Sequence, residues 1–195
     1  MNSLKMIVVA ALALTAQVGW AELIEWRTSD GGNGHYYEPI LVNGGVRFYD
    51  VNPDPEGEGW HLATLTSSIE NLFVYSLISD DRRFWRWDGI NAAGPWLGGF
   101  QPAGSPEPSG GWTWVTGEPW SFTCWASGEP CNLGGSENYL HYFARGSAAA
   151  PTWNDFPGEW PLPGYIRELD VPEPSTLALL ATMAGAMILR WRGGC

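Results

Sequence analysis

The middle of the chain alternates apolar and polar residues over short stretches that are bounded by glycine, proline or serine. Residues 111–115 follow this pattern, with Thr113 between Trp112 and Trp114, which is the period of two expected of a half-buried strand. Similar stretches predict strands at residues 34–42, 84–87, 95–100, 139–143 and 164–169. The pattern therefore predicts several short strands joined by long loops.

One stretch has the spacing of an amphipathic helix. Ser67 and Glu70 match a capping box, in which the serine caps the first turn and the glutamate stands three residues later. The residues on one face at helical spacing are Ile69, Leu72, Phe73, Ser76 and Leu77. We expect a helix over about residues 68–78.

An earlier helix is expected to begin within residues 46–50. Pro53 and Pro55 follow closely, and each proline locks φ and removes a backbone donor. This helix must therefore be short, or it must restart after Pro55.

Composition narrows the fold class. The chain has 195 residues, enough for one domain with a core, and it contains 13 Trp, 7 Tyr, 7 Phe, 25 Gly and 15 Pro. This combination favours a loop-rich fold with an aromatic core over a helical bundle.

The net charge is −11, and an acidic surface repels phosphate, so we expect no nucleic-acid partner.

The N-terminal end has the features of a secretory signal peptide. Lys5 precedes an apolar run at residues 6–16, and small residues follow at Gly19 and Ala21. This pattern predicts cleavage before Glu22.

The C-terminal end carries Pro172-Glu173-Pro174, an uncharged stretch at residues 176–189, and then Arg190 and Arg192. A helix over residues 176–189 would be about 21 Å long, short of the ~30 Å hydrocarbon core, so a removable tail is more natural than a stable anchor. The pattern resembles the PEP-CTERM tail of Gram-negative bacteria. The resemblance implies transient membrane insertion through 176–189, removal by a membrane sorting protease (an exosortase), and release to the cell envelope or extracellular matrix.

We therefore expect three segments in this chain. Residues 1–21 form the signal peptide, residues 22–170 form one folded domain, and residues 171–195 form the sorting tail with its short hydrophobic segment.

Cys124 and Cys131 are the cysteines of the expected mature chain. An exported protein meets an oxidising compartment, which favours a disulfide between them. Such a bond closes an eight-residue loop and would stabilise the fold by roughly 2.5 kcal/mol. The alternative is a pair of free, buried thiols.

Oxygen-bearing side chains gather in two segments, residues 128–138 and residues 153–155. They are Glu129, Asn132, Glu137, Asn138, Asn154 and Asp155. Ca²⁺ takes roughly six to eight oxygen ligands, often from flexible loops, so the two segments are candidates for a Ca²⁺ site. The alternative is a pair of solvated turns, because these are also ordinary loop residues.

Nine short motifs along residues 34–169 occur in the order found in C-type lectin-like domains. They are His61-Leu62-Ala63-Thr64, Glu70-Asn71, Trp96-Leu97-Gly98-Gly99, Trp112-Thr113-Trp114, Trp125, Gly128-Glu129-Pro130, Glu137-Asn138, Trp153-Asn154-Asp155 and Tyr165-Ile166-Arg167-Glu168. The chain thus resembles this family. The resemblance implies an α+β fold with two helices, two small antiparallel sheets and a long-loop region that binds Ca²⁺.

In sugar-binding members of the family, one set of side chains holds Ca²⁺ and also hydrogen-bonds two adjacent sugar hydroxyls. The matching residues here are Glu129, Glu137, Asn154 and Asp155. Cys131 departs from the pattern, because the family has asparagine at this position and sulfur is a poor ligand for Ca²⁺. Tyr139 and Arg167 stand where the family often has disulfide cysteines, so the core is expected to depend on aromatic packing.

The tryptophans divide into two expected groups. Those expected in the core are Trp112, Trp114, Trp125 and Trp153. Trp120 and Trp160 lie next to prolines and are candidates for exposed aromatic side chains.

These features predict an exported bacterial lectin-like protein that binds carbohydrate or exopolysaccharide through Ca²⁺. The alternative is a metal-independent protein-binding or structural component of the extracellular matrix on the same fold, which Cys131 favours. An enzyme is not expected, because no spacing brings Cys124 together with His61 or His141 and a disulfide would consume the thiol.

Overall fold

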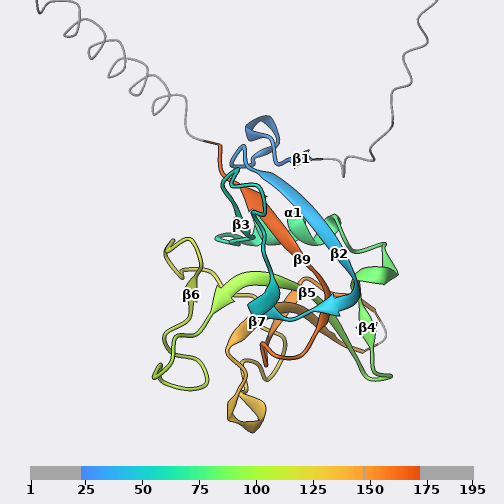
Figure 1. Cartoon of the computed structure of the whole chain (residues 1–195), viewed down its shortest axis with the longest axis vertical. Coiled ribbons are helices and arrows are strands. Elements are labelled where there is room, and N and C mark those ends of the chain that lie inside the picture. Colours follow the sequence, from blue (N-terminus) through green and yellow to red (C-terminus); the bar gives the residue numbers. More distant parts are fainter. Residues whose placement is uncertain (1–22, 147, 172–195) are drawn as a thin grey trace, which may run out of the picture.

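The computed structural model describes residues 23–146 and 148–171, in which one α-helix packs beside the β-strands (Figure 1). The strands are β1 Ile24–Glu25, β2 Tyr36–Val46, β3 Trp60–Leu62, β4 Arg86–Trp87, β5 Asn91–Phe100, β6 Thr113–Trp114, β7 Tyr139–Arg145, β8 Thr152–Phe156 and β9 Leu162–Leu169. The α-helix is α1 Ser68–Ser76, and 3-10 turns lie at Thr28–Asp30, Phe48–Asp50, Arg82–Phe84 and Leu133–Gly135. The expected α+β class is confirmed.

The strands form a single sheet, whereas two small sheets were implied by the resemblance. The order is β1-β2-β9-β5-β7-β8, with β3 paired to β9 and with β4 and β6 paired to β5. All pairs are antiparallel except β5 with β9, which are parallel and meet at Trp96 and Tyr165. This contact joins two antiparallel groups of strands, one formed by β1, β2, β3 and β9 and the other by β4, β5, β6, β7 and β8. β5 can pair with both groups because it is 10 residues long and has neighbours on both of its edges.

The pairing of β2 with β9 requires a glycine. Gly164 lies opposite Leu41, and a Cβ atom at this position would come within 1.9 Å of the backbone oxygen of Ile40. The two backbones therefore approach each other more closely than a side chain would allow, and β9 can lie between β2 and β3.

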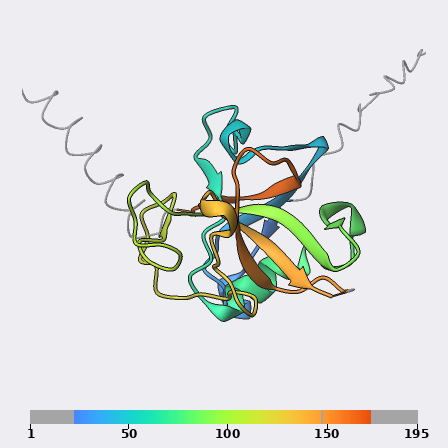
Figure 2. The same ribbon diagram turned by 90° about the horizontal axis from the view of Figure 1, so that it is seen from below.

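The predicted strands occur at the expected positions, but some of them are shorter than expected. The expected strands at residues 34–42, 95–100, 139–143 and 164–169 correspond to β2, β5, β7 and β9. The expected strand at residues 111–115 is reduced to the two residues of β6, and the one at 84–87 to β4. The long loop of residues 101–125 projects to one side of the sheet (Figure 2).

Helix α1 begins as predicted but buries a different face. Ser67 caps it by accepting the backbone N–H of Glu70 at 3.2 Å. Its buried residues are Glu70, Asn71 and Val74, while Ile69 and Leu72 are 62% and 55% exposed. The expected apolar face was therefore partly wrong, because hydrogen bonds to Glu70 from Thr66 and Tyr37 turn this glutamate inward.

The helix expected to begin within residues 46–50 is absent from the described residues. β2 continues to Val46, and only the 3-10 turn Phe48–Asp50 follows. The prolines at positions 53 and 55 explain the difference, because the chain beyond this turn must stay extended.

Aromatic side chains fill the core, as expected from composition. Trp112, Trp114 and Trp153 are buried. Trp120 packs against all three, with ring centroids 4.5 Å from Trp114 and 5.8 Å from Trp112, so the expectation that it is exposed was wrong. Trp160 is 57% exposed, as expected.

Both expected transport signals fall largely outside the described residues. These are the signal peptide at residues 1–21 and the uncharged stretch at residues 176–189. Within residues 23–146 and 148–171, no helix is both long enough and apolar enough to cross a membrane.

Candidate functional site

The two oxygen-rich segments meet where the loop of residues 128–138 folds over β8. Asp155 of β8 is fully buried, and its carboxylate accepts the backbone N–H of Cys131 at 3.0 Å and of Asn132 at 2.6 Å. Removing a buried acceptor would leave these donors unsatisfied. Asp155 therefore fixes the loop that carries the other predicted site residues.

Asn154 lies beside His141 because the two residues are paired across β7 and β8. Asn154 Nδ2 donates to the backbone oxygen of Asp155 at 2.5 Å and lies 3.3 Å from His141 Nε2. His141 is fully buried, and burial lowers its pKa to about 3, so its ring is neutral at physiological pH. His141 Nδ1 is buried and has no hydrogen-bond partner among the described residues.

Hydrogen bonds within the loop of residues 128–138 direct the Glu137 side chain inward. Its side chain accepts the backbone N–H of Leu133 at 2.5 Å, and its Oε2 lies 3.6 Å from Cys131 Sγ. Its own backbone N–H donates to Asn132 Oδ1 at 3.0 Å, and Asn132 has a left-handed φ of 45°, which asparagine tolerates. Glu137 is consequently only 6% exposed.

Glu129 is held by Arg145 of β7, a residue that sequence reasoning missed. Arg145 Nη2 donates to Glu129 Oε1, and the Glu129 side chain is 4% exposed. Glu129 Oε2 is buried without a hydrogen-bond partner in the described part of the chain. A buried carboxylate oxygen without a partner is costly, so this atom is available to a cation or to a ligand hydroxyl.

Three of the four predicted site residues, Glu129, Glu137 and Asn154, line one pocket of about 470 Å³. The fourth, Asp155, lies against it, since the ligand atoms of Glu129, Cys131 and Asp155 all fall within 4.8 Å of one another. The other lining residues are Arg86, Asp88, Asn91, Ala93, Cys131, Leu133, His141, Phe143, Arg145 and Phe156. The fold therefore brings together the four residues that the motifs identified.

The pKa values of two carboxyl groups at the pocket, Glu137 and Asp155, are raised. Burial raises the pKa of Glu137 to about 7, and the neighbouring charges of Asp155 and Glu129 add to this effect. Burial likewise raises the pKa of Asp155, although the backbone donors of the loop oppose it. Desolvation of its sulfur atom and the adjacent Glu129 raise the pKa of the Cys131 thiol to about 12, so the thiol stays protonated at neutral pH.

The predicted disulfide between Cys124 and Cys131 is not formed. Both cysteines are free, Cys124 half-buried and Cys131 exposed. Their surroundings differ: the Cys124 carbonyl accepts the backbone N–H of Trp153 beside the aromatic core, whereas Cys131 Sγ faces Glu137. Asp155 holds the backbone of Cys131 in this position.

The donor set fits a hard divalent cation, with fewer protein ligands than the resemblance implies. Oxygen donors converge, and one of them, Glu129 Oε2, is buried and has no other partner among the described residues. The Asp155 carboxylate already accepts backbone N–H groups, and Cys131 supplies a protonated sulfur in place of an amide oxygen. Oxygen donors of this kind are the ligands that Ca²⁺ takes in proteins.

Comparison with known proteins identifies the fold. No protein-family model matches the chain. The C-type lectin CEL-I from Cucumaria echinata is 19% identical, with a TM-score of 0.53 over 72% of this chain and 93% of that one. The carbohydrate-recognition domain of the mouse scavenger receptor C-type lectin is 20% identical, with a TM-score of 0.50 over 71% of this chain and 92% of that one.

A third solved structure agrees with these two. It is the C-type carbohydrate-recognition domain of cow CD23 in the presence of a GlcNAc2Man3 oligosaccharide, which is 18% identical with a TM-score of 0.50 over 71% of this chain and 90% of that one. These likenesses, together with the mixed helix and sheet architecture, show that the chain has the C-type lectin-like fold.

Proposed function

We propose that this protein binds carbohydrate in the pocket lined by Glu129, Glu137 and Asn154, with Ca²⁺ as the bridging ion. The observation that carries the proposal is Glu129 Oε2, a buried carboxylate oxygen of the pocket that no described residue satisfies. A divalent cation would satisfy this oxygen. It would also stabilise the ionised form of Glu137, whose pKa is raised by burial and by the nearby charges of Asp155 and Glu129.

Each residue has a distinct task in this proposal. Glu129, Glu137 and Asn154 present oxygen atoms to the ion, and Asp155 holds the loop in place through its backbone donors. Bound Ca²⁺ would supply open coordination positions for two adjacent sugar hydroxyls. Arg145 fixes Glu129 through Oε1 and leaves Oε2 for the ion.

The pocket also has apolar surface suited to a sugar ring. Phe143 and Phe156 line it, and the exposed ring of Trp160 lies 6.1 Å from that of Phe156. Carbohydrate binding by the mouse and cow domains that share this fold gives further support.

The test is Ca²⁺ and glycan binding by the full chain and two matched variants. Glu129→Gln keeps the shape of the side chain but removes its charge, and we expect Ca²⁺ affinity to fall by at least about tenfold. Cys131→Asn restores an amide oxygen beside the ion, and we expect about tenfold tighter binding. Calorimetric titration with Ca²⁺ measures both changes, and a glycan array with and without chelator follows.

Two results would contradict the proposal. One is an absence of any Ca²⁺-dependent change in calorimetry or thermal unfolding. The other is equal Ca²⁺ affinity in the wild type and in Glu129→Gln, with Glu56→Gln as the control for loss of an exposed carboxylate elsewhere.

The second candidate function is metal-independent binding of a protein or a structural role in the extracellular matrix. The observation that favours it is that the Asp155 carboxylate already accepts hydrogen bonds from the loop backbone, which leaves it fewer lone pairs for a metal ion. This function predicts partner binding that survives chelation and is unaffected by Glu129→Gln.

We further propose that the chain is exported and then processed at both ends. The apolar run after Lys5 supports cleavage before Glu22, and the Pro-Glu-Pro motif with its uncharged stretch supports removal of the tail by a membrane sorting protease. The expected destination is the cell envelope or extracellular matrix.

A further inference from the structure

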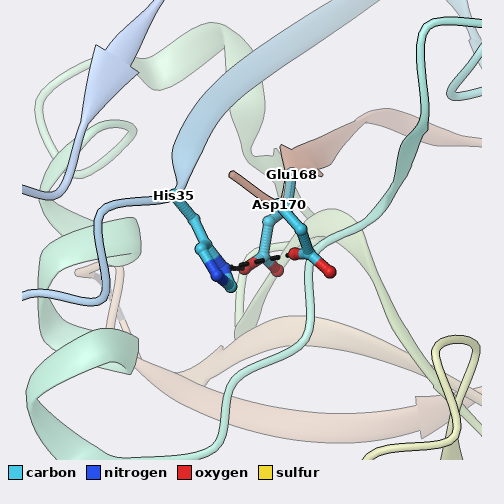
Figure 3. A group of neighbouring side chains, drawn as sticks. All are labelled: His35, Glu168 and Asp170. Atoms are coloured by element: carbon cyan, nitrogen blue, oxygen red, sulfur yellow. Dashed lines mark hydrogen bonds and ion pairs between the residues drawn. The ribbon is translucent and has the colours of Figure 1, made fainter. Parts of the chain in front are cut away.

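Two of the three histidines of the chain contact one carboxylate at the end of β9. His35 Nδ1 lies 3.2 Å from Asp170 Oδ1, and His61 Nε2 lies 3.1 Å from the same oxygen. Glu168 is also part of the group, with Oε1 2.7 Å from His35 Nδ1 (Figure 3). None of these residues belongs to the pocket described above.

The sheet brings the four residues together from three strands. β9 lies between β2 and β3 and carries Glu168, which is opposite His61 in one pairing and opposite Tyr37 in the other. His35 immediately precedes β2, and Asp170 immediately follows β9. In Figure 1 this end of the sheet is at the top, and the orange loop that contains the proposed sugar site is at the bottom.

Hydrogen bonds alone do not account for the environment of His61. His61 Nδ1 lies 2.9 Å from the backbone oxygen of Leu62, which can only accept, so Nδ1 carries a proton. In a neutral ring Nε2 then has a lone pair, and this lone pair faces a carboxylate oxygen of Asp170 at 3.1 Å. Two acceptors at this distance repel each other unless a positive charge lies between them or on the ring.

Hydrogen bonds also fail to account for all the polar contacts of His35. Its Nδ1 lies within hydrogen-bond distance of three polar atoms: Glu168 Oε1 at 2.7 Å, Asp170 Oδ1 at 3.2 Å and Asn33 Nδ2 at 3.1 Å. The Asn33 amide also donates to Tyr37 and Glu70, so the two carboxylates are the demand on His35. One ring nitrogen can make a single conventional hydrogen bond, so it cannot satisfy both of them. A cation among these atoms would satisfy both carboxylates and the nitrogen lone pair.

Glu168 is held as a metal-binding carboxylate usually is. It is 2% exposed, its Oε1 lies 2.8 Å from the Tyr37 hydroxyl oxygen, and its Oε2 accepts the backbone N–H of Thr64 at 2.8 Å. His61 holds Asp170 from outside this group, because its Nε2 lies 3.1 Å from Asp170 Oδ1. Asp170, whose side chain is 56% exposed, leaves the group open to solvent.

We propose that His35, Glu168 and Asp170, whose ligand atoms all lie within 4.8 Å of one another, form a binding site for Zn²⁺. One imidazole nitrogen and two carboxylates are a donor set that suits Zn²⁺, whereas Ca²⁺ takes oxygen ligands. Zn²⁺ is usually four-coordinate, so three protein ligands leave one position for water. The ion would tie the start of β2 to the end of β9, next to Val171, the last described residue.

The test uses the full chain, stripped of metal and then titrated with Co²⁺ and Zn²⁺. Co²⁺ should give the visible absorption of a tetrahedral nitrogen and oxygen site, without a thiolate charge-transfer band, and Zn²⁺ should displace it in a 1:1 ratio. Asp170→Asn and His35→Ala should each weaken Zn²⁺ binding by at least about 100-fold. Far-UV circular dichroism in chelator should find both variants folded.

Two controls separate this site from other metal-binding groups. Cys131→Ser should leave the Co²⁺ spectrum and the Zn²⁺ affinity unchanged, because the site has no sulfur ligand. Asp50→Asn removes an exposed carboxylate that pairs with Arg47, and it should also bind Zn²⁺ as the wild type does.

The proposal would be overturned if the stripped chain bound no Zn²⁺, in which case a proton on the histidines alone balances the carboxylates. It would equally be overturned if folded Asp170→Asn bound Zn²⁺ as tightly as the wild type, or if Cys131→Ser abolished binding. The proposal does not depend on carbohydrate binding, because it concerns residues outside the pocket.

Discussion

Glu137 is a nearly buried carboxylate with two others close by, Glu129 and Asp155. Its pKa rises from an ordinary value of 4.5 to about 7, chiefly because burial disfavours the charged form. At pH 8 and without metal the folded protein must keep this charge in a poorly solvated position. Glu137 therefore destabilises the metal-free fold at neutral and higher pH.

This leads to a pH-dependent prediction for Glu137→Gln in chelator. A carboxylate whose pKa is higher in the folded state favours folding while it is protonated, and this advantage is lost as the pH rises from 4.5 through about 7. The variant should therefore gain up to about 3 kcal/mol in unfolding free energy relative to the wild type at pH 8, and nothing at pH 4. Urea unfolding at the two pH values measures the difference.

The exposed Glu56→Gln is the control, and it should unfold like the wild type at both pH values. An equal or lower stability of Glu137→Gln at pH 8 would mean that the carboxylate is better solvated or better paired than the geometry indicates. With Ca²⁺ present, the wild type should recover its deficit if the proposed site forms.

At the scale of elements, α1 illustrates how a local signal and a tertiary contact combine. Ser67 caps the helix by accepting the Glu70 N–H, which is half of the predicted capping box. The Glu70 side chain does not return to Ser67 but accepts from the backbone and the hydroxyl of Thr66 and from Tyr37. The start of the helix is thus set locally, and its orientation is set by the strand it packs against.

We expect Ser67→Ala to lower the unfolding free energy by about 1 kcal/mol, because the first turn loses its cap. Ser68→Ala is a matched control one residue later, exposed and inside the helix, where alanine is a good helix former. It should be neutral or slightly stabilising. Equal effects of the two substitutions in urea unfolding would show that the Ser67 contact contributes nothing.

At the scale of the whole molecule, β9 connects the parts. It pairs with β2 and β3 and meets β5 at Trp96 and Tyr165, so it joins the two antiparallel groups. The strand ends at Leu169, shortly before the Pro-Glu-Pro motif. Cleavage close to this motif would therefore leave the whole sheet intact.

We expect protein recovered from the envelope or medium of its native host to begin at Glu22 and to lack residues 176–195. The reason is that the uncharged stretch is too short for a stable membrane anchor. Intact-mass measurement and terminal peptides decide this. A variant with alanine in place of Pro172 and Pro174 should retain its tail, and recovery of full-length wild-type protein would contradict the export proposal.

Much of the fold was predictable because it depends on local patterns. The Trp112-Thr113-Trp114 alternation marks β6, and Ser67 marks the start of α1. The length of β6 was not predictable, since pairing with only two residues of β5 limits it. Trp120 was misjudged because its neighbouring prolines indicate a turn but not whether the ring points inward, where it meets Trp114.

Some residues of the candidate site could likewise be predicted from the sequence, and others could not. Glu129, Glu137, Asn154 and Asp155 could be named from motif order, and the fold brings them together. Arg145 could not, because it lies 16 residues from Glu129 and no local pattern joins them. The free state of Cys131 was likewise hidden, since it depends on the backbone bonds that Asp155 makes from β8.

The sequence by itself determined the residue types at the site, the start of the helix and the positions of the main strands, because these follow from short-range periodicity and side-chain chemistry. Tertiary structure decided which groups are partnered. The single sheet, the unsatisfied oxygen of Glu129 and the approach of His35 and His61 to Asp170 all arise from residues distant in the chain. Burial and hydrogen-bond partners are properties of that arrangement, and they determine what the same side chains can bind.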